Sequence, residues 1–119
     1  GFCHTCVLSG GLLYACGVGA DGQLGLGNMQ RKVLLEIVPP LLGCGYPVEV
    51  SCGRNCTCVR SADGDIFTCG DNRFGQLGIA RTAANSLRFI RHSGMLVGFA
   101  AQQTCMAATS TLVVIEDML

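Results

Sequence analysis

Charged residues are scarce in this sequence, and neither sign predominates. Only 13% of the 119 residues are charged, against roughly a quarter in a typical globular domain. Eight basic and eight acidic residues give a formal net charge of zero. We therefore expect no direct nucleic-acid partner and no membrane partner. So few charged residues also suit a segment of a larger protein, whose remaining parts would cover the apolar faces of the segment.

Long apolar runs, sustained helical periodicity and a signal-peptide pattern are also missing. The run at 111–115 falls far short of the ~20 residues that span a membrane. Residues 1–16 have no basic region and no small-residue cleavage site. No stretch keeps a 3.6-residue apolar period, which excludes a solenoid of stacked helices. A turn or so at 81–86 is the one helix candidate.

Nine cysteines cannot form a complete disulfide framework, because an odd count leaves one unpaired. They lie inside apolar, strand-like runs, unlike the cysteines of small secreted domains. We predict free, mostly buried thiols in an intracellular compartment, cytoplasmic or nuclear, with disulfides or a metal site as the alternatives. Cys3-His4-Thr5-Cys6 resembles half a zinc site. Its two cysteines should lie on opposite faces of a strand, so we predict no metal there, nor at Cys56 and Cys58.

What the sequence does contain is an internal repeat. Residues 1–9 match the segment that starts 52 residues later, and one extra residue, Ala62, then moves the offset to 53. The tetrapeptide Gly-Gln-Leu-Gly follows in register in both copies. A tetrapeptide repeated inside a longer match predicts two copies of one structural unit. This repeat signature consists of Gly22, Gln23, Leu24 and Gly25 in the first copy and Gly75, Gln76, Leu77 and Gly78 in the second.

Each copy has the pattern of short strands joined by glycine turns. The predicted strands are 3–8, 12–16, 48–52, 56–60, 66–69 and 96–101, with glycine-rich loops at 17–28 and 70–78. Asp63-Gly64 lies between two of these strands and predicts a type I′ hairpin turn, with positive φ at both residues. The period of about 50 residues predicts an all-β partial β-propeller. We divide it into repeat 1 (1–52), repeat 2 (53–101) and a degenerate start of repeat 3 (102–119).

These motifs resemble the regulator of chromosome condensation repeat. The matching residues are Gly1, His4, Thr5, Leu8, Tyr14 and Gly17 in the first copy, Gly53, Thr57, Asp63, Gly64, Phe67 and Gly70 in the second, and both tetrapeptides. The resemblance implies a seven-bladed propeller, of which this segment supplies about two blades of short antiparallel strands and the start of a third. The other blades of the same chain would then be its neighbours.

One departure from the family pattern is the lack of tryptophan. Cys16 and Cys69 stand where the family usually has Trp, and the chain has no Trp at all. A plant photoreceptor of this fold senses light with Trp clusters, so that role is excluded for this segment.

Two motifs suggest chemistry when taken alone. Residues 17–22 match the dinucleotide fingerprint, but no helix opener and no suitably spaced carboxylate follow, so we expect no cofactor. His4 has no recognisable nucleophile or acid beside it, so we expect no catalytic residue and no enzyme. As a family-type histidine, His4 should bond to backbone and tie its strand to a neighbouring loop. We expect the Gln23 and Gln76 amides to satisfy loop backbone groups.

Four charged residues in loops or at strand ends are our candidate partner contacts, because loops on a rigid scaffold often carry function. They are Asp21, Arg54, Asp71 and Arg73. Our first hypothesis is a protein-interaction scaffold within a larger protein. The resemblance implies an alternative, guanine-nucleotide exchange on a Ran-type small GTPase. A small Cys-rich metal or disulfide module is a third reading, which the repeat disfavours.

Overall fold

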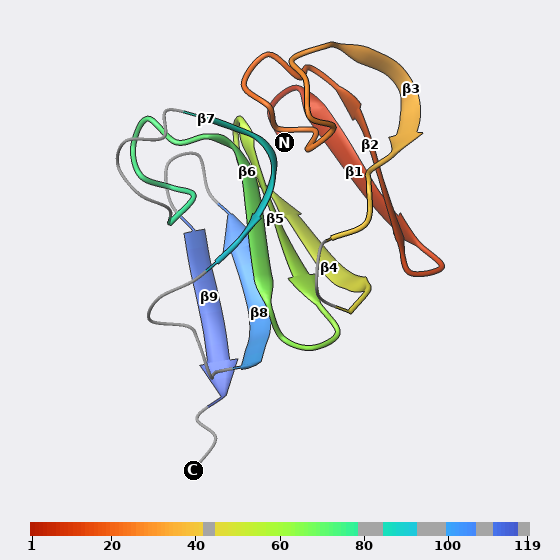
Figure 1. The fold of residues 1–119 in the computed structure, drawn as a ribbon. Helices are drawn as coiled ribbons and strands as arrows, with labels where there is room; N and C mark the ends of the chain where they lie inside the picture. The colour runs from red at the N-terminus through yellow and green to blue at the C-terminus, as the bar shows by residue number, and fades with distance from the viewer. Residues whose placement is uncertain (42–44, 79–84, 93–99, 107–110, 117–119) are drawn as a thin grey trace.

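The computed structural model describes residues 1–41, 45–78, 85–92, 100–106 and 111–116, the last two ranges by their backbone. All regular structure in these ranges is β, in nine strands (Figure 1). They are β1 (His4–Ser9), β2 (Leu12–Gly17), β3 (Lys32–Ile37), β4 (Pro47–Cys52), β5 (Cys56–Ser61), β6 (Ile66–Asp71), β7 (Asn85–Arg91), β8 (Ala100–Met106) and β9 (Thr111–Glu116). No helix in the described ranges is long and apolar enough to cross a membrane.

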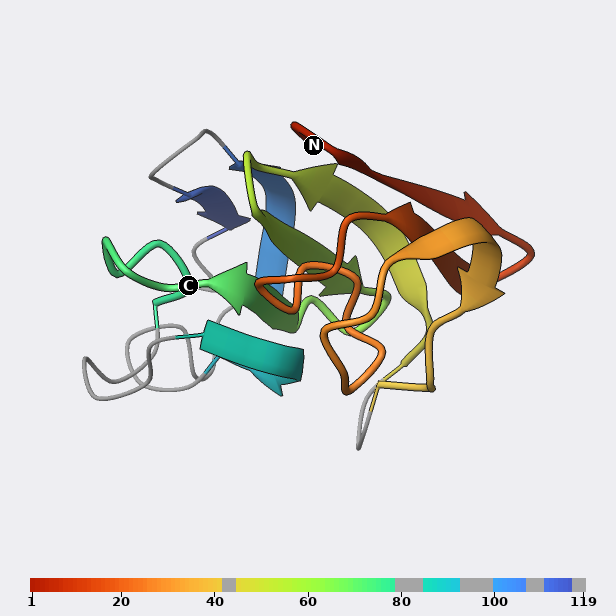
Figure 2. The same ribbon diagram turned by 90° about the horizontal axis from the view of Figure 1, so that it is seen from above.

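The strands form three antiparallel sheets that follow one another along the chain. The first has the order β1-β2-β3, the second β4-β5-β6-β7 and the third β8-β9. β1 contacts β4, and β8 contacts both β4 and β5. Figures 1 and 2 show the sheets side by side in chain order. The predicted all-β partial propeller, with about two blades and the start of a third, is thereby confirmed.

The predicted hairpin strands are confirmed to within two residues, but three further strands were not predicted. The sequence pattern did not indicate β3, because apolar and polar residues do not alternate along it. Val33 and Leu34 are adjacent apolar residues, and both are exposed, at 82% and 79%. β7 pairs with β6 through a register shift between Thr68 and Gly70, which obscures its period. β9 contains the apolar run 111–115.

Two other predicted segments lie partly outside the described residues. The helical turn at 81–86 is wrong for Asn85 and Ser86, which open β7, while 81–84 lie outside the described residues. Within the strand predicted at 96–101, Ala100 and Ala101 belong to β8, and 96–99 lie outside the described residues.

The two hairpin turns differ, and the predicted type I′ turn at Asp63-Gly64 is wrong. In the first hairpin Gly10 and Gly11 both have positive φ, +57° and +76°, as a two-residue type I′ loop requires. In the second only Gly64 does, at +82°. Its N–H donates to Ser61 O at 2.9 Å, which closes a three-residue loop ending in a left-handed glycine. The extra residue Ala62 accounts for the longer loop.

The sheets do not coincide with the sequence repeats. β4 ends predicted repeat 1, yet it pairs with β5 of repeat 2, with Cys52 opposite Thr57 and Ser51 opposite Cys58. The second sheet is therefore assembled from both repeats.

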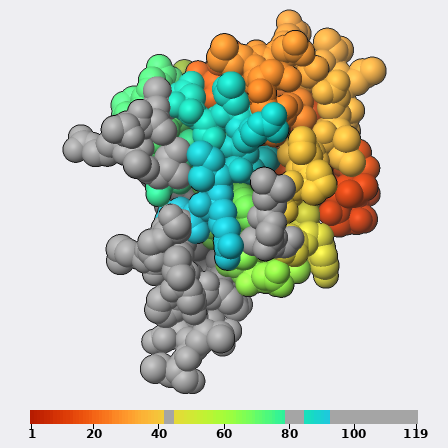
Figure 3. Space-filling view, in the orientation of Figure 1, coloured from red at the N-terminus to blue at the C-terminus, as the bar shows by residue number. Residues whose placement is uncertain are grey.

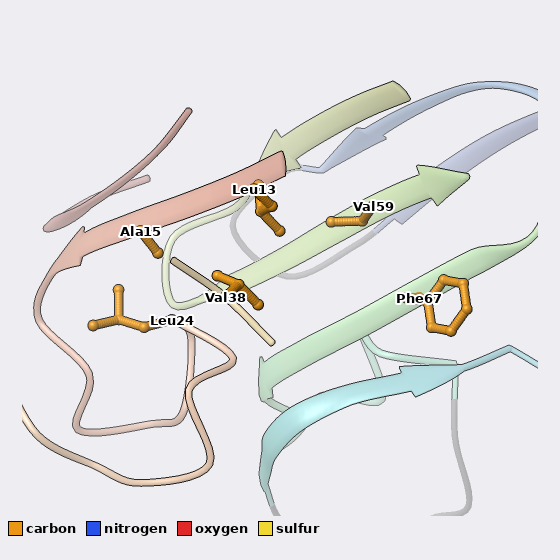
Figure 4. Packing of buried hydrophobic residues seen from close by; sticks show 6 residues of the cluster. All are labelled: Leu13, Ala15, Leu24, Val38, Val59 and Phe67. Atoms are coloured by element: carbon orange, nitrogen blue, oxygen red, sulfur yellow. The ribbon is translucent and has the colours of Figure 1, made fainter. Parts of the chain in front are cut away.

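One apolar core joins the first two sheets (Figure 4). Its buried members are Leu13, Ala15, Leu24 and Val38 from the first unit and Val59 and Phe67 from β5 and β6. Burying a large apolar side chain stabilises a fold by about 1.5–3 kcal/mol. This shared core holds the two sheets, and the loops between their strands, in fixed positions.

Candidate functional site

The loops that follow β2 and β6 have the same backbone structure. Each makes two successive turns: Gly22 N donates to Gly19 O and Gly25 N to Gly22 O, at 3.0 and 3.1 Å. Gly75 N and Gly78 N repeat these bonds at the same two distances. All four glycines of the two tetrapeptides have φ between +68° and +84°, a region that other residues rarely adopt. The repeat signature is therefore a structural element.

The glutamine of each tetrapeptide has the predicted role, and the leucine beside it is buried. Gln23 Oε1 accepts a hydrogen bond from Asp21 N, and Gln76 Oε1 accepts one from Phe74 N, both at 2.9 Å. Leu24 and Leu77 are each only 1% exposed. Besides its two backbone turns, each loop is thus fixed by a hydrogen bond to the glutamine side chain and by one buried leucine.

The loop after β2 also lies against the second sheet. Gly27 N donates to Leu87 O at 2.9 Å, and Leu26 forms a bridge with Arg88 of β7. A Cβ atom on Gly22 would lie 2.5 Å from Ser86 O, so this close approach needs glycine. Figure 3 shows β7, in cyan, beside the orange loop. Of the fingerprint-like glycines, Gly22 therefore serves packing between the sheets, whereas Gly17 and Gly19 lie close to backbone oxygens of the first unit, Cys3 O and Gln30 O.

A buried polar chain connects the two sheets at their loop ends. His4 Nε2 and Thr57 Oγ1 lie 2.9 Å apart, and the Thr57 hydroxyl donates to Gln23 O at 2.6 Å. Because that single proton goes to Gln23, Thr57 Oγ1 accepts from His4 Nε2–H. The expectation that His4 bonds to backbone is therefore wrong. Its partner is a side chain of the next sheet, and it reaches the loop only through Thr57.

Two of the predicted contact residues form a bidentate ion pair. Arg73 Nε lies 3.0 Å from Asp71 Oδ1, and Arg73 Nη2 lies 2.9 Å from Asp71 Oδ2. Burial works against the charged carboxylate, but bonds from Arg73 outweigh it and lower the pKa of Asp71. The Asp71 side chain is 4% exposed and that of Arg73 is 64% exposed. The buried acid thus holds an arginine that faces solvent.

The other two predicted contacts, Asp21 and Arg54, lie in different settings. Asp21 accepts a hydrogen bond from Asn85 Nδ2 at 3.2 Å, and its charge helps to raise the pKa of Arg73, after the larger effect of Asp71. Asp21 therefore belongs with the ion pair. The Arg54 guanidinium lies 4.9 Å from the centre of the Phe2 ring, a cation–π contact.

We call these residues the loop edge, because they lie where β1 and β5 begin and where β2 and β6 end. It comprises Phe2, Asp21, Arg54, Asp71, Arg73 and Phe74. Phe2 and Phe74, which are 70% and 69% exposed, were not among the predicted contacts. An aromatic residue next to a predicted contact in a glycine-rich loop, as in Arg73-Phe74, was the available signal.

The seven cysteines whose side chains the structure describes divide by burial, while the side chains of Cys44 and Cys105 lie outside the described residues. Cys56, Cys58 and Cys69 are buried, Cys6, Cys16 and Cys52 are partly buried, and Cys3 is exposed. Cys3 is thus not a buried thiol, because it precedes the first residue of β1. Burial raises the pKa of both Cys56 and Cys69. Those two thiols are accordingly poor nucleophiles.

A group that the sequence pattern did not indicate consists of His4, Cys6 and Cys52. One ring nitrogen and the two sulfur atoms all lie within 4.8 Å of one another. A hydrogen bond with Cys6 lowers the pKa of Cys52 to about 4, and raises that of Cys6. Cys52 is distant in sequence and comes from another sheet, so spacing alone could not reveal the group.

Comparisons with known proteins agree with the repeat pattern. Two models of the regulator of chromosome condensation (RCC1) repeat match residues 10–60 and 48–76, together more than half of the chain. A secretion-regulating guanine nucleotide exchange factor of Mus musculus is 42% identical over 78 residues, 64% of this chain and 16% of that protein. An X-linked retinitis pigmentosa GTPase regulator of Canis lupus familiaris is 34% identical over 77 residues, 64% of this chain and 8% of that protein. The chain thus spans less than a fifth of either relative.

Solved structures agree as well. Human WBSCR16 matches 93% of this chain with 28% of its own, at 27% identity and a TM-score of 0.84. Prp20p from Saccharomyces cerevisiae, whose structure was described together with its binding properties to Gsp1p and histones, matches 99% of this chain with 30% of its own. Its identity is 16% and its TM-score 0.76, so this likeness concerns the fold alone.

Proposed function

Since this chain belongs to the regulator of chromosome condensation repeat family, we propose that it is a protein-interaction segment of a larger propeller-bearing protein. The loop edge carries this proposal. It presents two exposed aromatic rings and two arginines on loops that a shared core and a buried polar chain hold in place. Function on this fold has to be argued from such a site, because one fold serves many functions.

The chemistry of the loop edge suits a protein partner. Tyr, Trp and Arg dominate binding energy at protein interfaces, and Phe and Met are also enriched there. Arg73 is held by a bidentate bond to Asp71, so binding would cost little side-chain entropy. Arg54 is similarly held over Phe2. We propose no catalysis by this segment and a cytoplasmic or nuclear location for the protein.

A small GTPase is the partner class that the relatives favour. One relative is named a guanine nucleotide exchange factor and another a GTPase regulator. This supports exchange on a small GTPase as the second candidate function, which the complete protein rather than this segment would carry out.

Site-specific photo-crosslinking tests the scaffold proposal. A photoreactive amino acid placed at Phe2 or Phe74 of the full-length protein should form a discrete cross-link to a second protein in cells. The same amino acid at Val33, which is 82% exposed on β3, is the control and should not. Equal cross-linking at Val33, or none at the loop edge, would contradict the proposal.

Charge-reversal variants test binding of a small GTPase, and a nucleotide-release assay separates the two candidate functions. With purified small GTPases, Arg54→Glu and Arg73→Glu should each weaken binding of the full-length protein at least tenfold, about 1.4 kcal/mol. Arg91→Glu is the matched control, because Arg91 lies at the other end of its sheet, beside Asp65. Accelerated release of a fluorescent nucleotide would favour exchange, whereas binding without acceleration would favour the scaffold. An absence of binding to every GTPase tested would exclude this partner class.

A further inference from the structure

In place of the sequence-based expectation that His4 and Cys6 bind no metal, the geometry points to a site for a thiophilic divalent cation, with zinc as the expected ion, formed by His4, Cys6 and Cys52. Two thiols and an imidazole are the ligand types that zinc prefers in proteins. The three ligand atoms lie within 4.8 Å of one another. Around a tetrahedral zinc ion, ligand atoms are about 3.4–3.8 Å apart, given bonds of about 2.0–2.3 Å. A small inward movement of the side chains would close the site.

The position of the group in the fold explains why its members meet. His4 and Cys6 are two residues apart on β1, so they lie on the same face of that strand. Cys52 is the last residue of β4 in the second sheet, which packs against β1. Cys6 and Cys52 are partly exposed, so an ion has a path to them. Such an ion would join two sheets that the backbone connects only through residues 38–46.

The His4 ring is prepared for coordination. It is 3% exposed, and Nε2–H is committed to Thr57 Oγ1. That tautomer leaves the nitrogen lone pair on Nδ1. Nδ1 is buried and has no hydrogen-bond partner among the described residues. Histidines that bind metals usually donate their other ring N–H to an oxygen acceptor, which is the part Thr57 plays here.

The ligands also balance the charge of the ion. The two sulfur atoms already lie within 4.8 Å of each other. On binding, two Zn–S bonds and one Zn–N bond form, and the protons of the two thiols pass to solvent. Two thiolates and a neutral imidazole then neutralise a doubly charged cation, with no change in oxidation state. Three protein ligands leave the fourth position of a tetrahedron to water.

Cobalt(II) and zinc(II) are the probes for this site in the reduced full-length protein. We expect one ion per chain after equilibrium dialysis, and a sulfur-to-cobalt charge-transfer band on titration with cobalt. Cys52→Ser and Cys6→Ser should each weaken binding at least tenfold and diminish the band. Cys3→Ser is the matched control, because Cys3 is exposed and lies outside the group. It should bind as the unmodified protein does.

Thiol mapping tests the same site without any substitution that could disturb folding. Alkylation with and without zinc, followed by peptide mass spectrometry, should show protection of Cys6 and Cys52 and none of Cys3. The inference is overturned if cobalt produces no charge-transfer band, if zinc leaves Cys6 and Cys52 equally reactive, or if Cys3→Ser loses as much affinity as Cys52→Ser.

Discussion

Replacing Thr57 by valine should destabilise the protein more than loss of the hydroxyl group of Thr5 or Thr68. Thr57 is fully buried, and its oxygen lies between His4 Nε2 and Gln23 O. Valine has nearly the same shape, so the change leaves no cavity, but it strands His4 Nε2–H and leaves Gln23 O with only the weak bond from Cys69 Sγ at 3.6 Å. Each unsatisfied buried group costs about 1–3 kcal/mol. Allowing for some relaxation, we expect a loss of about 2–4 kcal/mol in the free energy of unfolding.

Urea unfolding of the full-length protein, followed by circular dichroism, measures this loss. Thr68→Val is the graded control, because the Thr68 hydroxyl donates one buried hydrogen bond, to Leu77 O at 2.9 Å. It should cost about half as much. Thr5→Val is the neutral control, because Thr5 is exposed on β1, and it should stay within about 0.5 kcal/mol. If Thr57→Val costs no more than Thr68→Val, the polar chain does not couple the two sheets.

Four further predictions can be checked by standard assays. Gly70→Ala should cost more stability than Gly75→Ala, by at least about 1 kcal/mol, in the same urea assay; both glycines have positive φ, but only at Gly70 would a Cβ meet a carbonyl oxygen, at 2.4 Å. Because the folded state lowers the pKa of Asp71, its contribution to stability should be complete above the usual value of about 3.9 and disappear as the pH falls through the lower folded value; Asp71→Asn should remove this part of the acid limb of a stability–pH curve. In native protein a thiol reagent should modify Cys3 readily and Cys69 only after unfolding, without prior reductant, as peptide mapping would show; modification of both at equal rates would contradict the burial of Cys69. Residues 1–119 expressed alone should self-associate, because β3 exposes apolar side chains and few charges oppose pairing; a compact monomer in size-exclusion chromatography with light scattering would refute this.

Local features of the fold could be predicted, because their causes lie within a few residues. Gln23 bonds to a backbone group two residues away, and Gln76 does the same, so one short loop contains the whole interaction. Hairpin strands were equally accessible, because they alternate around glycine turns. β3 could not be recognised, because its exposed apolar residues give no period.

Contacts between the sheets escaped prediction for a different reason. The bond between His4 and Thr57 joins residues 53 positions apart. Cys52 approaches Cys6 because β4, which belongs to repeat 1 in the sequence, pairs within the second sheet. Of the predicted contacts, Asp71 and Arg73 were already close in sequence, whereas the place of Asp21 beside them depends on how the sheets pack.

The displacement of β4 bears on how such a protein can grow or shrink in evolution. Repeat 1 supplies β4 to the sheet of repeat 2, so a strand from the preceding sequence unit completes that sheet. A duplication or deletion of one whole unit, wherever its end points fall, restores the same pairing at the new junction. An exchange that replaces only part of a unit would join a strand to a sheet selected with another partner. We therefore expect recombination in steps of one repeat length to preserve the strand pairing, whereas other step lengths would disturb it.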